Sequence, residues 1–171
     1  MPRRRVVWVT DASPWGLGGI QVVGGHITEY FYSRLQASDF KKFHAAPGLP
    51  KFMPIWEALA LLVAAKAWGP ALTELDDVSV KLDNLGVVFN VARHRASHPE
   101  VSKILRELAL VEMSFPLSSQ SVSTAEHIPG ISNVIPDALS RQWDPIPLPF
   151  PPGCWHRFAF RRSFFPPKRR I

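Results

Sequence analysis

Four acidic residues occupy positions where a carboxylate is costly. Asp11 ends an apolar segment with strand character, and Glu57 lies inside an apolar segment with helix character. Asp83 follows a second apolar strand, and Asp137 lies at the start of a short helix. Hard dications such as Mg²⁺ take oxygen ligands, and two of them about 3.5–4 Å apart activate water and stabilise a leaving oxygen in phosphodiester hydrolysis. The four residues together predict a two-metal hydrolytic site with two Mg²⁺ ions, for which Mn²⁺ is the expected substitute.

Each carboxylate also has a structural explanation of its own. Asp11 suits the turn that follows it, because Asp favours turns. Asp83 suits the N-cap of the next helix, and Asp137 complements the dipole of the last one. Glu57 is harder to explain in this way, because its neighbours are apolar and a buried ionised carboxylate without a partner is costly. Glu57 therefore predicts a cationic partner.

The composition predicts one folded domain followed by a tail. A chain of 171 residues with 46% hydrophobic residues is long enough for one buried core and short for two. Most of the net charge of +6 lies in residues 143–171, where arginines alternate with prolines and aromatic residues. Dense proline removes backbone donors and fixes φ, so regular structure is not expected there. We predict a domain over residues 1–142 and a linker or disordered tail over 143–171.

Cysteine usage and hydropathy favour an intracellular protein. The single cysteine, Cys154, cannot form an internal disulfide, and no Cys and His spacing suggests a zinc site. No apolar run is expected to approach the roughly 20 residues that span a bilayer, and the basic start lacks the apolar stretch of a signal peptide. We expect a cytoplasmic or nuclear location, or both, and no membrane partner.

The hydrophobic pattern predicts an α/β fold. A meander of three strands comes first, and strands and helices then alternate, which is typical of a mixed sheet with helices packed against it. If the first and fourth strands pair in parallel, Asp11 and Asp83 lie at the same edge of the sheet. Residues 35–53 have no clear period and are expected to form a connection. The predicted strands are 4–10, 20–23, 27–34, 78–82 and 122–128, and the predicted helices are 55–68, 84–92, 99–113 and 136–140.

Four ordered blocks of sequence surround the acidic residues. They are Thr10-Asp11-Ala-Ser with Gly16-Leu-Gly18-Gly19, Trp56-Glu57-Ala-Leu-Ala-Leu, Asp83-Asn84, and His127-Ile-Pro-Gly130 with Asn133-Val and Asp137-Ala-Leu-Ser-Arg141. Over about residues 5–141 these blocks resemble the ribonuclease H domain of a retroelement reverse transcriptase, of the gypsy or DIRS type. The resemblance implies a ribonuclease H-like fold, a five-stranded mixed sheet of order 3-2-1-4-5 flanked by helices.

The resemblance also implies cleavage of the RNA strand of an RNA·DNA hybrid with two Mg²⁺ ions. Asp11 would bridge both metals. Glu57 and Asp83 would hold the metal nearer the leaving group, and Asp137 would hold the metal that activates water. His127 matches the family's assisting histidine, which is thought to help product release or proton transfer. The alternative for His127 is a histidine at a strand end that is hydrogen-bonded to the nearby loop.

Five residues are candidates for contact with the substrate. Main-chain groups near Ser13 and the amide of Asn84 suit recognition of the 2′-hydroxyl, although turn and cap chemistry explain both equally well. Asn133 belongs to the same block as Asp137. Arg93 and Arg95 suit contact with phosphates, with a solvated charged turn as the alternative.

Two features leave the function open. The interval between the helices at 84–92 and 99–113 is too short for the basic helix-loop of many cellular ribonucleases H, so a polymerase domain is the expected partner in substrate binding. The basic, aromatic tail also suits nucleic-acid contact. A catalytically silent, retroelement-derived binding or structural module is therefore one alternative. A DNA-cutting integrase or transposase of the same fold superfamily is another, although the context of Asp137 favours ribonuclease H.

Overall fold

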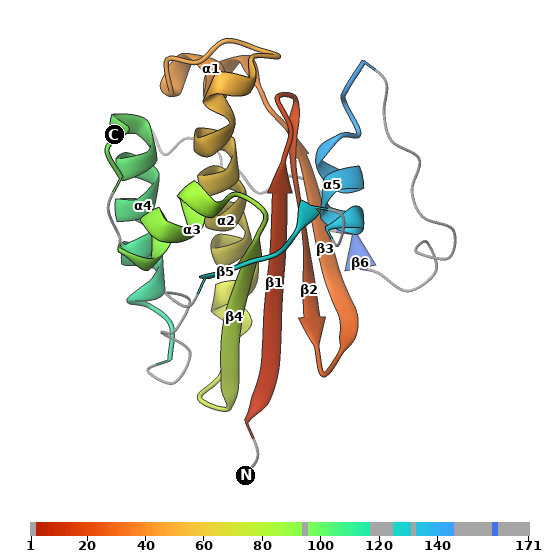
Figure 1. Cartoon of the computed structure of the whole chain (residues 1–171). Helices are drawn as coiled ribbons and strands as arrows, with labels where there is room; N and C mark the ends of the chain where they lie inside the picture. Colours follow the sequence, from red (N-terminus) through yellow and green to blue (C-terminus); the bar gives the residue numbers. More distant parts are fainter. Residues whose placement is uncertain (1–2, 94–95, 117–124, 131–132, 146–158, 161–171) are drawn as a thin grey trace.

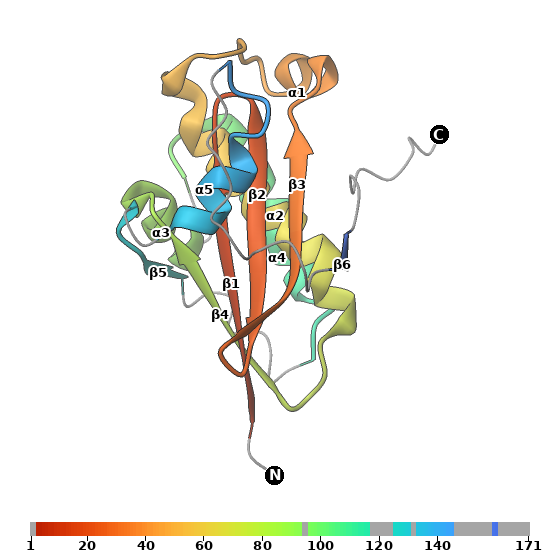
Figure 2. The same ribbon diagram turned by 90° about the vertical axis from the view of Figure 1, so that its right-hand side faces the viewer.

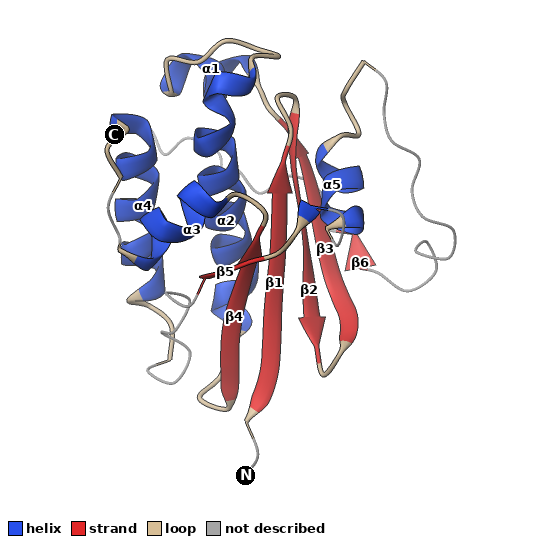
Figure 3. Cartoon of the chain, viewed as in Figure 1, coloured by secondary structure: helices blue, strands red, loops and turns tan. Residues whose placement is uncertain are grey.

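A mixed β-sheet forms the centre of the molecule (Figures 1 and 3). The computed structural model describes residues 3–93, 96–116, 125–130, 133–145 and 159–160. The strands follow the order β5-β4-β1-β2-β3-β6 across the sheet. They are β1 (Arg4–Ala12), β2 (Gly16–Val23), β3 (His26–Arg34), β4 (Asp76–Leu82), β5 (Ala125–His127) and β6 (Ala159–Phe160).

Helices cover both faces of this sheet (Figure 2). Helix α2 lies across β1 and β2 on one face and α4 packs against α2, whereas α5 lies on the opposite face against β1, β2 and β3. Short 3₁₀ turns at Pro50–Phe52 and Gly69–Ala71 flank α2. The helices are α1 (Ala37–Lys42), α2 (Met53–Trp68), α3 (Leu85–Ala92), α4 (Pro99–Glu112) and α5 (Val134–Ser140).

The predicted order 3-2-1-4-5 is confirmed. Strands β1, β2 and β3 form the antiparallel meander, and β4 pairs with β1 in parallel. The parallel register aligns Val9 with Lys81. Two residues further along the chain, Asp11 on β1 and Asp83 just after β4 lie near each other at the carboxyl edge of the sheet. The topology therefore brings two of the four acidic residues together.

Two predicted irregular segments contain regular structure. Residues 35–53, predicted as a connection, include α1, because the Asp39 carboxylate accepts a hydrogen bond of 2.7 Å from the backbone N–H of Gln36 and closes a capping box. The tail contributes β6, two residues that pair in parallel with β3 and satisfy part of its open edge. Residues 122–124 of the predicted fifth strand lie outside the described residues.

Helix α2 is the buried core helix. The helical run Pro50–Ala71, 22 residues with its flanking turns, is long and apolar enough by length and composition to cross a membrane. The expectation that no run approaches that length was therefore wrong. Burial accounts for this composition. Within the most apolar stretch of the run, 78% is buried inside the protein, and Trp56 and Leu61 have no exposed surface. A helix that is apolar all round is suited to such a position between a sheet and another helix.

Glu112, the last residue of α4, is expected to make stability depend on pH. It is 6% exposed, its Oε1 has no hydrogen-bond partner among the described residues, and burial raises its pKa to about 7. The folded chain keeps a proton that the unfolded chain loses, so stability falls as pH rises from about 4.5 to about 7. We expect Glu112→Gln to raise the free energy of unfolding by about 1–2 kcal/mol at pH 8 and by almost nothing at pH 4. Urea denaturation at both pH values measures this, and an equal gain at both would contradict it.

Candidate active site

Three carboxylates from three elements meet at the carboxyl edge of β1 and β4. Asp11 lies on β1, Asp83 directly follows β4, and Glu57 lies in the second turn of α2. One oxygen of each carboxylate lies within 4.8 Å of those of the other two. The backbone N–H of Ala12 donates a hydrogen bond of 3.3 Å to Glu57 Oε1 and fixes the side chain at this edge. We call Asp11, Glu57, Asp83 and their neighbour Asp137 the acidic cluster.

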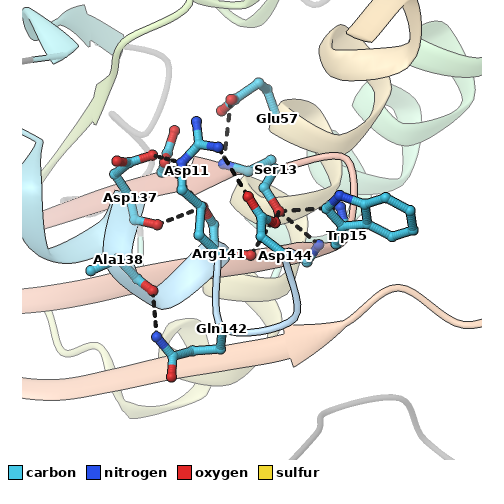
Figure 4. A network of polar contacts seen from close by, with 12 residues as sticks. Asp11, Ser13, Trp15, Glu57, Asp137, Ala138, Arg141, Gln142 and Asp144 are labelled. Atoms are coloured by element: carbon cyan, nitrogen blue, oxygen red, sulfur yellow. Dashed lines mark hydrogen bonds and ion pairs between the residues drawn. The ribbon is translucent and has the colours of Figure 1, made fainter. Parts of the chain in front are cut away.

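Asp137 reaches this site from the opposite face of the sheet (Figure 4). It lies on α5, and its negative charge acts on Asp11. Its charge also acts on Asp83. Ser140, one turn later on α5, donates a hydrogen bond of 3.2 Å from Oγ to Asp11 Oδ2. Helix α5 therefore contributes Asp137 to the acidic cluster, and its Ser140 donates a hydrogen bond to Asp11.

Glycines in β2 allow α5 to lie directly on the sheet. A Cβ atom at Gly18 would lie 2.6 Å from the Cβ of Leu139, the carbonyl oxygen of Pro136 and the backbone N of Ser140. Gly18 pairs with Asp11 across β1 and β2. Glycine in a strand often marks such a close backbone approach. Gly18 thus sets the distance between α5 and Asp11.

Burial and mutual repulsion raise the pKa values of the cluster. Burial, followed by the charges of Asp83 and Asp137, raises the pKa of Asp11 to about 8. Burial, then the charges of Asp11 and Asp83, raises the pKa of Glu57 well above its usual value. Burial and the charge of Asp137 also raise the pKa of Asp83. Carboxylates placed this way take up protons or cations.

The donor set fits hard divalent cations. All four side chains offer oxygen ligands, which Mg²⁺ and Mn²⁺ prefer. Glu57 Oε2 is buried and has no hydrogen-bond partner among the described residues. Buried polar atoms without a partner are rare in folded proteins and call for an explanation such as an ion. A dication beside Asp11 and Glu57 would satisfy this oxygen and remove the repulsion.

His127 lies next to the acidic cluster. It is exposed at the end of β5, and its charge acts to lower the pKa of Asp83. A Cβ on Gly130, in the loop that follows, would lie 3.7 Å from Asp83 Oδ2, which places this loop beside the same carboxylate. The position agrees with an assisting histidine, whose role stays a prediction.

Ser13 is buried inside the loop that follows β1. Its hydroxyl lies 2.8 Å from the carbonyl oxygen of Ser140 and 3.0 Å from Asp144 Oδ1, and it accepts hydrogen bonds from the backbone N–H groups of Trp15 and Gly16. Its own N–H donates to the carbonyl oxygen of Gly16. The hydroxyl and the N–H of Ser13 are therefore engaged in holding the loop. These contacts match turn chemistry, the alternative to contact with the substrate.

Asn84, and not Asp83, caps α3. Its Oδ1 accepts a hydrogen bond of 3.1 Å from the backbone N–H of Val87, which is the geometry of an N-cap. The cap explanation for Asp83 is therefore wrong, and the Asp83 carboxylate faces the acidic cluster instead. Contact between the Asn84 amide nitrogen and a substrate stays a prediction.

The other candidate contacts lie in different environments. Asn133, the residue before α5, is 1% exposed, and neither polar atom of its side chain has a partner among the described residues. Its carbonyl oxygen accepts the backbone N–H of Asp137, so it supports the first turn of α5. Arg93 is exposed directly after α3. Arg95 lies outside the described residues.

Two charged residues of the site were not among the predicted site residues. Arg141 Nε donates a hydrogen bond of 2.6 Å to Asp137 Oδ1, and its Nη1 lies 3.0 Å from Asp144 Oδ2. The spacing of four residues between Asp137 and Arg141 is the signal that would have paired them. Asp144 gives no such signal, because it lies in the predicted tail. The ring centroid of Trp143 lies 5.3 Å from that of Tyr32, so contacts with the sheet continue past residue 142.

Comparisons with known proteins link this architecture to ribonucleases H. No family model and no curated protein matches the sequence. Among solved structures, RNase H1 from the halophilic archaeon Halobacterium salinarum NRC-1 aligns with a TM-score of 0.59 at 20% identity, over 79% of this chain and 93% of that one. LC11-RNase H1, isolated from compost by a metagenomic approach, gives 0.59 at 16% identity, over 81% and 93%.

The third similar structure is the N-terminal RNase H domain of a Mycobacterium tuberculosis protein, solved as a fusion with maltose-binding protein. It aligns with a TM-score of 0.58 at 16% identity, over 80% of this chain and 90% of that one. Identities in this range establish a shared fold. Together with the strand order and the helices on both faces, they show that this chain has the ribonuclease H-like fold.

Proposed function

We propose that this chain is a metal-dependent ribonuclease H that hydrolyses the RNA strand of an RNA·DNA hybrid. The observation that carries the proposal is the convergence of Asp11, Glu57 and Asp83, whose oxygens lie within 4.8 Å of one another, with Asp137 beside them on α5. Carboxylates in this arrangement, at the carboxyl edge of a ribonuclease H-like sheet, suit a pair of dications acting on a phosphodiester.

In this proposal each residue of the acidic cluster has a separate task. Asp11, central and nearly buried, would hold both dications; Glu57 and Asp83 would hold one, and Asp137 the other. Bound dications supply a water activated for attack and charge stabilisation at the leaving oxygen. The Ala12 N–H orients Glu57, and Ser140 orients Asp11. His127, exposed beside Asp83, would exchange a proton with solvent or assist the release of product.

We further propose that the chain is the ribonuclease H domain of a retroelement reverse transcriptase, of the gypsy or DIRS type. The ordered sequence blocks around the four acidic residues support this assignment. The short interval between α3 and α4, residues 93–98, supports it too, because no basic helix-loop for hybrid binding fits there. A polymerase domain in the same polyprotein is then the partner that supplies much of the contact with substrate.

The proposed activity predicts a specific pattern of cleavage. The full chain is incubated with labelled RNA·DNA hybrid, duplex RNA and duplex DNA, each with Mg²⁺, Mn²⁺ or a chelator. We expect cleavage of the hybrid alone, dependent on metal, with 5′-phosphate and 3′-hydroxyl ends. Asp83→Asn, purified in parallel, serves as the matched control for contaminating nucleases and is expected to be inactive.

Two outcomes would reject the proposed activity. If the hybrid stays intact under every metal condition, or if Asp83→Asn cuts as fast as the parent chain, the catalytically silent binding module becomes the better account. Metal-dependent cleavage of duplex DNA with no preference for the hybrid would instead favour the integrase-like alternative.

A further inference from the structure

Arg141 lies between two carboxylates that have different surroundings (Figure 4). Its Nε donates to Asp137 Oδ1 at 2.6 Å, inside the acidic cluster, and its Nη1 lies 3.0 Å from Asp144 Oδ2, outside it. The side chain of Arg141 is 38% exposed, whereas that of Asp144 is 11% exposed. The guanidinium group thus has one partner that is a candidate metal ligand and one that is not.

Asp144 is itself held in place on both sides. Its Oδ1 lies 3.0 Å from Ser13 Oγ, whose single proton it shares with the carbonyl oxygen of Ser140, and its backbone N–H donates to the carbonyl oxygen of Arg141. Ser13 is fixed in turn by the backbone N–H groups of Trp15 and Gly16. The Asp144 carboxylate is therefore a fixed acceptor anchored to the loop that follows Asp11.

This geometry has a consequence for cation binding by Asp137. A dication bound by Asp137 would compete with the Arg141 N–H group for the charge of that carboxylate, and would weaken or replace a charge-assisted hydrogen bond in a partly buried site. Asp144 offers that guanidinium a second acceptor within reach. The carboxylate also balances the positive charge that would otherwise stand next to the incoming dication.

We propose that Asp144 is a positioning residue that retains Arg141 when Asp137 binds a dication, and so increases the metal affinity of the acidic cluster. The proposal rests on the proposed function in one respect, because it takes Asp137 to be a metal ligand. Asp144 lies outside all four sequence blocks, and its action passes through Arg141. A residue that only added negative charge nearby would strengthen cation binding whether Arg141 were present or not.

A double-mutant cycle separates these two possibilities. Mn²⁺ binding is measured by titration calorimetry on the full chain, Asp144→Asn, Arg141→Gln and the double variant. Asparagine keeps an acceptor for Ser13 but removes the charge that holds Arg141. We expect Asp144→Asn to weaken Mn²⁺ binding about fivefold in the parent chain and by less than about twofold in the Arg141→Gln background. Asp77→Asn, at an exposed position on β4, is the matched charge control and is expected to leave the affinity unchanged.

The opposite pattern would overturn the proposal. Equal weakening by Asp144→Asn in both backgrounds would assign its effect to charge alone, and no weakening in either would leave Asp144 with a purely structural role. If Asp144→Asn does not fold, side-chain NMR of ¹⁵N-arginine in the parent chain gives the same test. With saturating Mg²⁺ the Arg141 guanidinium protons should stay protected from exchange with water, and their loss of protection would overturn the proposal.

The experiments can separate a failure of this proposal from a failure of the proposed function. The Mn²⁺ titration needs no nucleic acid. If the variants show the predicted changes in Mn²⁺ affinity but the parent chain does not cut hybrid, the nuclease activity alone is rejected. A chain that cuts hybrid with unchanged Mn²⁺ affinity in all variants would reject the role of Asp144 alone.

Discussion

Asp11→Asn is expected to abolish hybrid cleavage while making the metal-free protein more stable. Asp11 is 3% exposed, and burial together with the charges of Asp83 and Asp137 raises its pKa to about 8. The folded chain holds a proton that the unfolded chain releases, so stability falls as pH rises from about 4 to about 8. Asparagine carries no charge at any pH and removes this cost. A residue whose charge is costly to the fold is thus central to the proposed chemistry.

The expected effects are large in both directions. We expect the free energy of unfolding in chelator at pH 7 to rise by about 2 kcal/mol, allowing for relaxation around the buried group, with no gain below about pH 4. We expect the rate of hybrid cleavage in Mg²⁺ to fall by about 10³-fold or more. Urea denaturation and a gel-based cleavage assay measure the two quantities. Asp77→Asn, exposed on β4, is the control and should change stability by no more than about 0.5 kcal/mol.

A stable and fully active Asp11→Asn variant would show that the acidic cluster is not the catalytic site. A variant that loses both activity and stability would show that the Asp11 carboxylate supports the fold, contrary to the repulsion described above.

Gly18→Ala is expected to displace α5 from the sheet and so to separate Asp137 from Asp11. The new Cβ would lie 2.6 Å from three atoms of α5, two of them backbone atoms that cannot move without moving the helix. We expect a loss of about 1–3 kcal/mol in stability. We also expect a fall of about 10²-fold in cleavage rate, because a displacement of about 1 Å in a catalytic group has effects of that size.

Gly86→Ala on α3 is the matched control for this substitution. A Cβ there would lie 3.3 Å from Asn84 Oδ1, the oxygen that caps α3, so the cap has to shift by a few tenths of an ångström, whereas alanine favours a helix over glycine. Because these effects oppose each other, we expect this variant to be about as stable as the parent chain. Crystal structures of both variants would show whether α5 has moved. A Gly18→Ala variant that keeps the parent cleavage rate would contradict the role of this glycine in placing Asp137.

The sequence predicted the parts of the site that depend on short-range patterns. Asp11 and Asp83 each end a strand with a clear apolar pattern, so parallel pairing of those strands was enough to bring them together. The cost of burying Glu57 in an apolar helix singled it out, and it lies beside Asp11 and Asp83; its cationic partner stays a prediction. The sheet order came from the family resemblance, and the strand pairing confirms it.

The parts that were not predicted depend on tertiary contacts. The close approach of α5 to β2 depends on the absence of a side chain at Gly18. The glycine is visible in the sequence, but the sequence does not show which element packs against it. The contact between Arg141 and Asp144 forms where the chain turns back on the loop after Asp11, and nothing in a proline-rich tail distinguishes that aspartate. Helix α1 depends on a single capping interaction at Asp39, within a segment without a hydrophobic period.

The acidic cluster is tested most directly by an anomalous difference map from crystals of the full chain grown with Mn²⁺. We predict Mn²⁺ density bounded by the carboxylates of Asp11, Glu57, Asp83 and Asp137, and its loss in crystals of Asp11→Asn grown in the same way. Mn²⁺ density only at other acidic side chains, such as Glu100 or Glu107, with the cluster empty at saturating metal, would contradict the assignment of these four residues as one dication site.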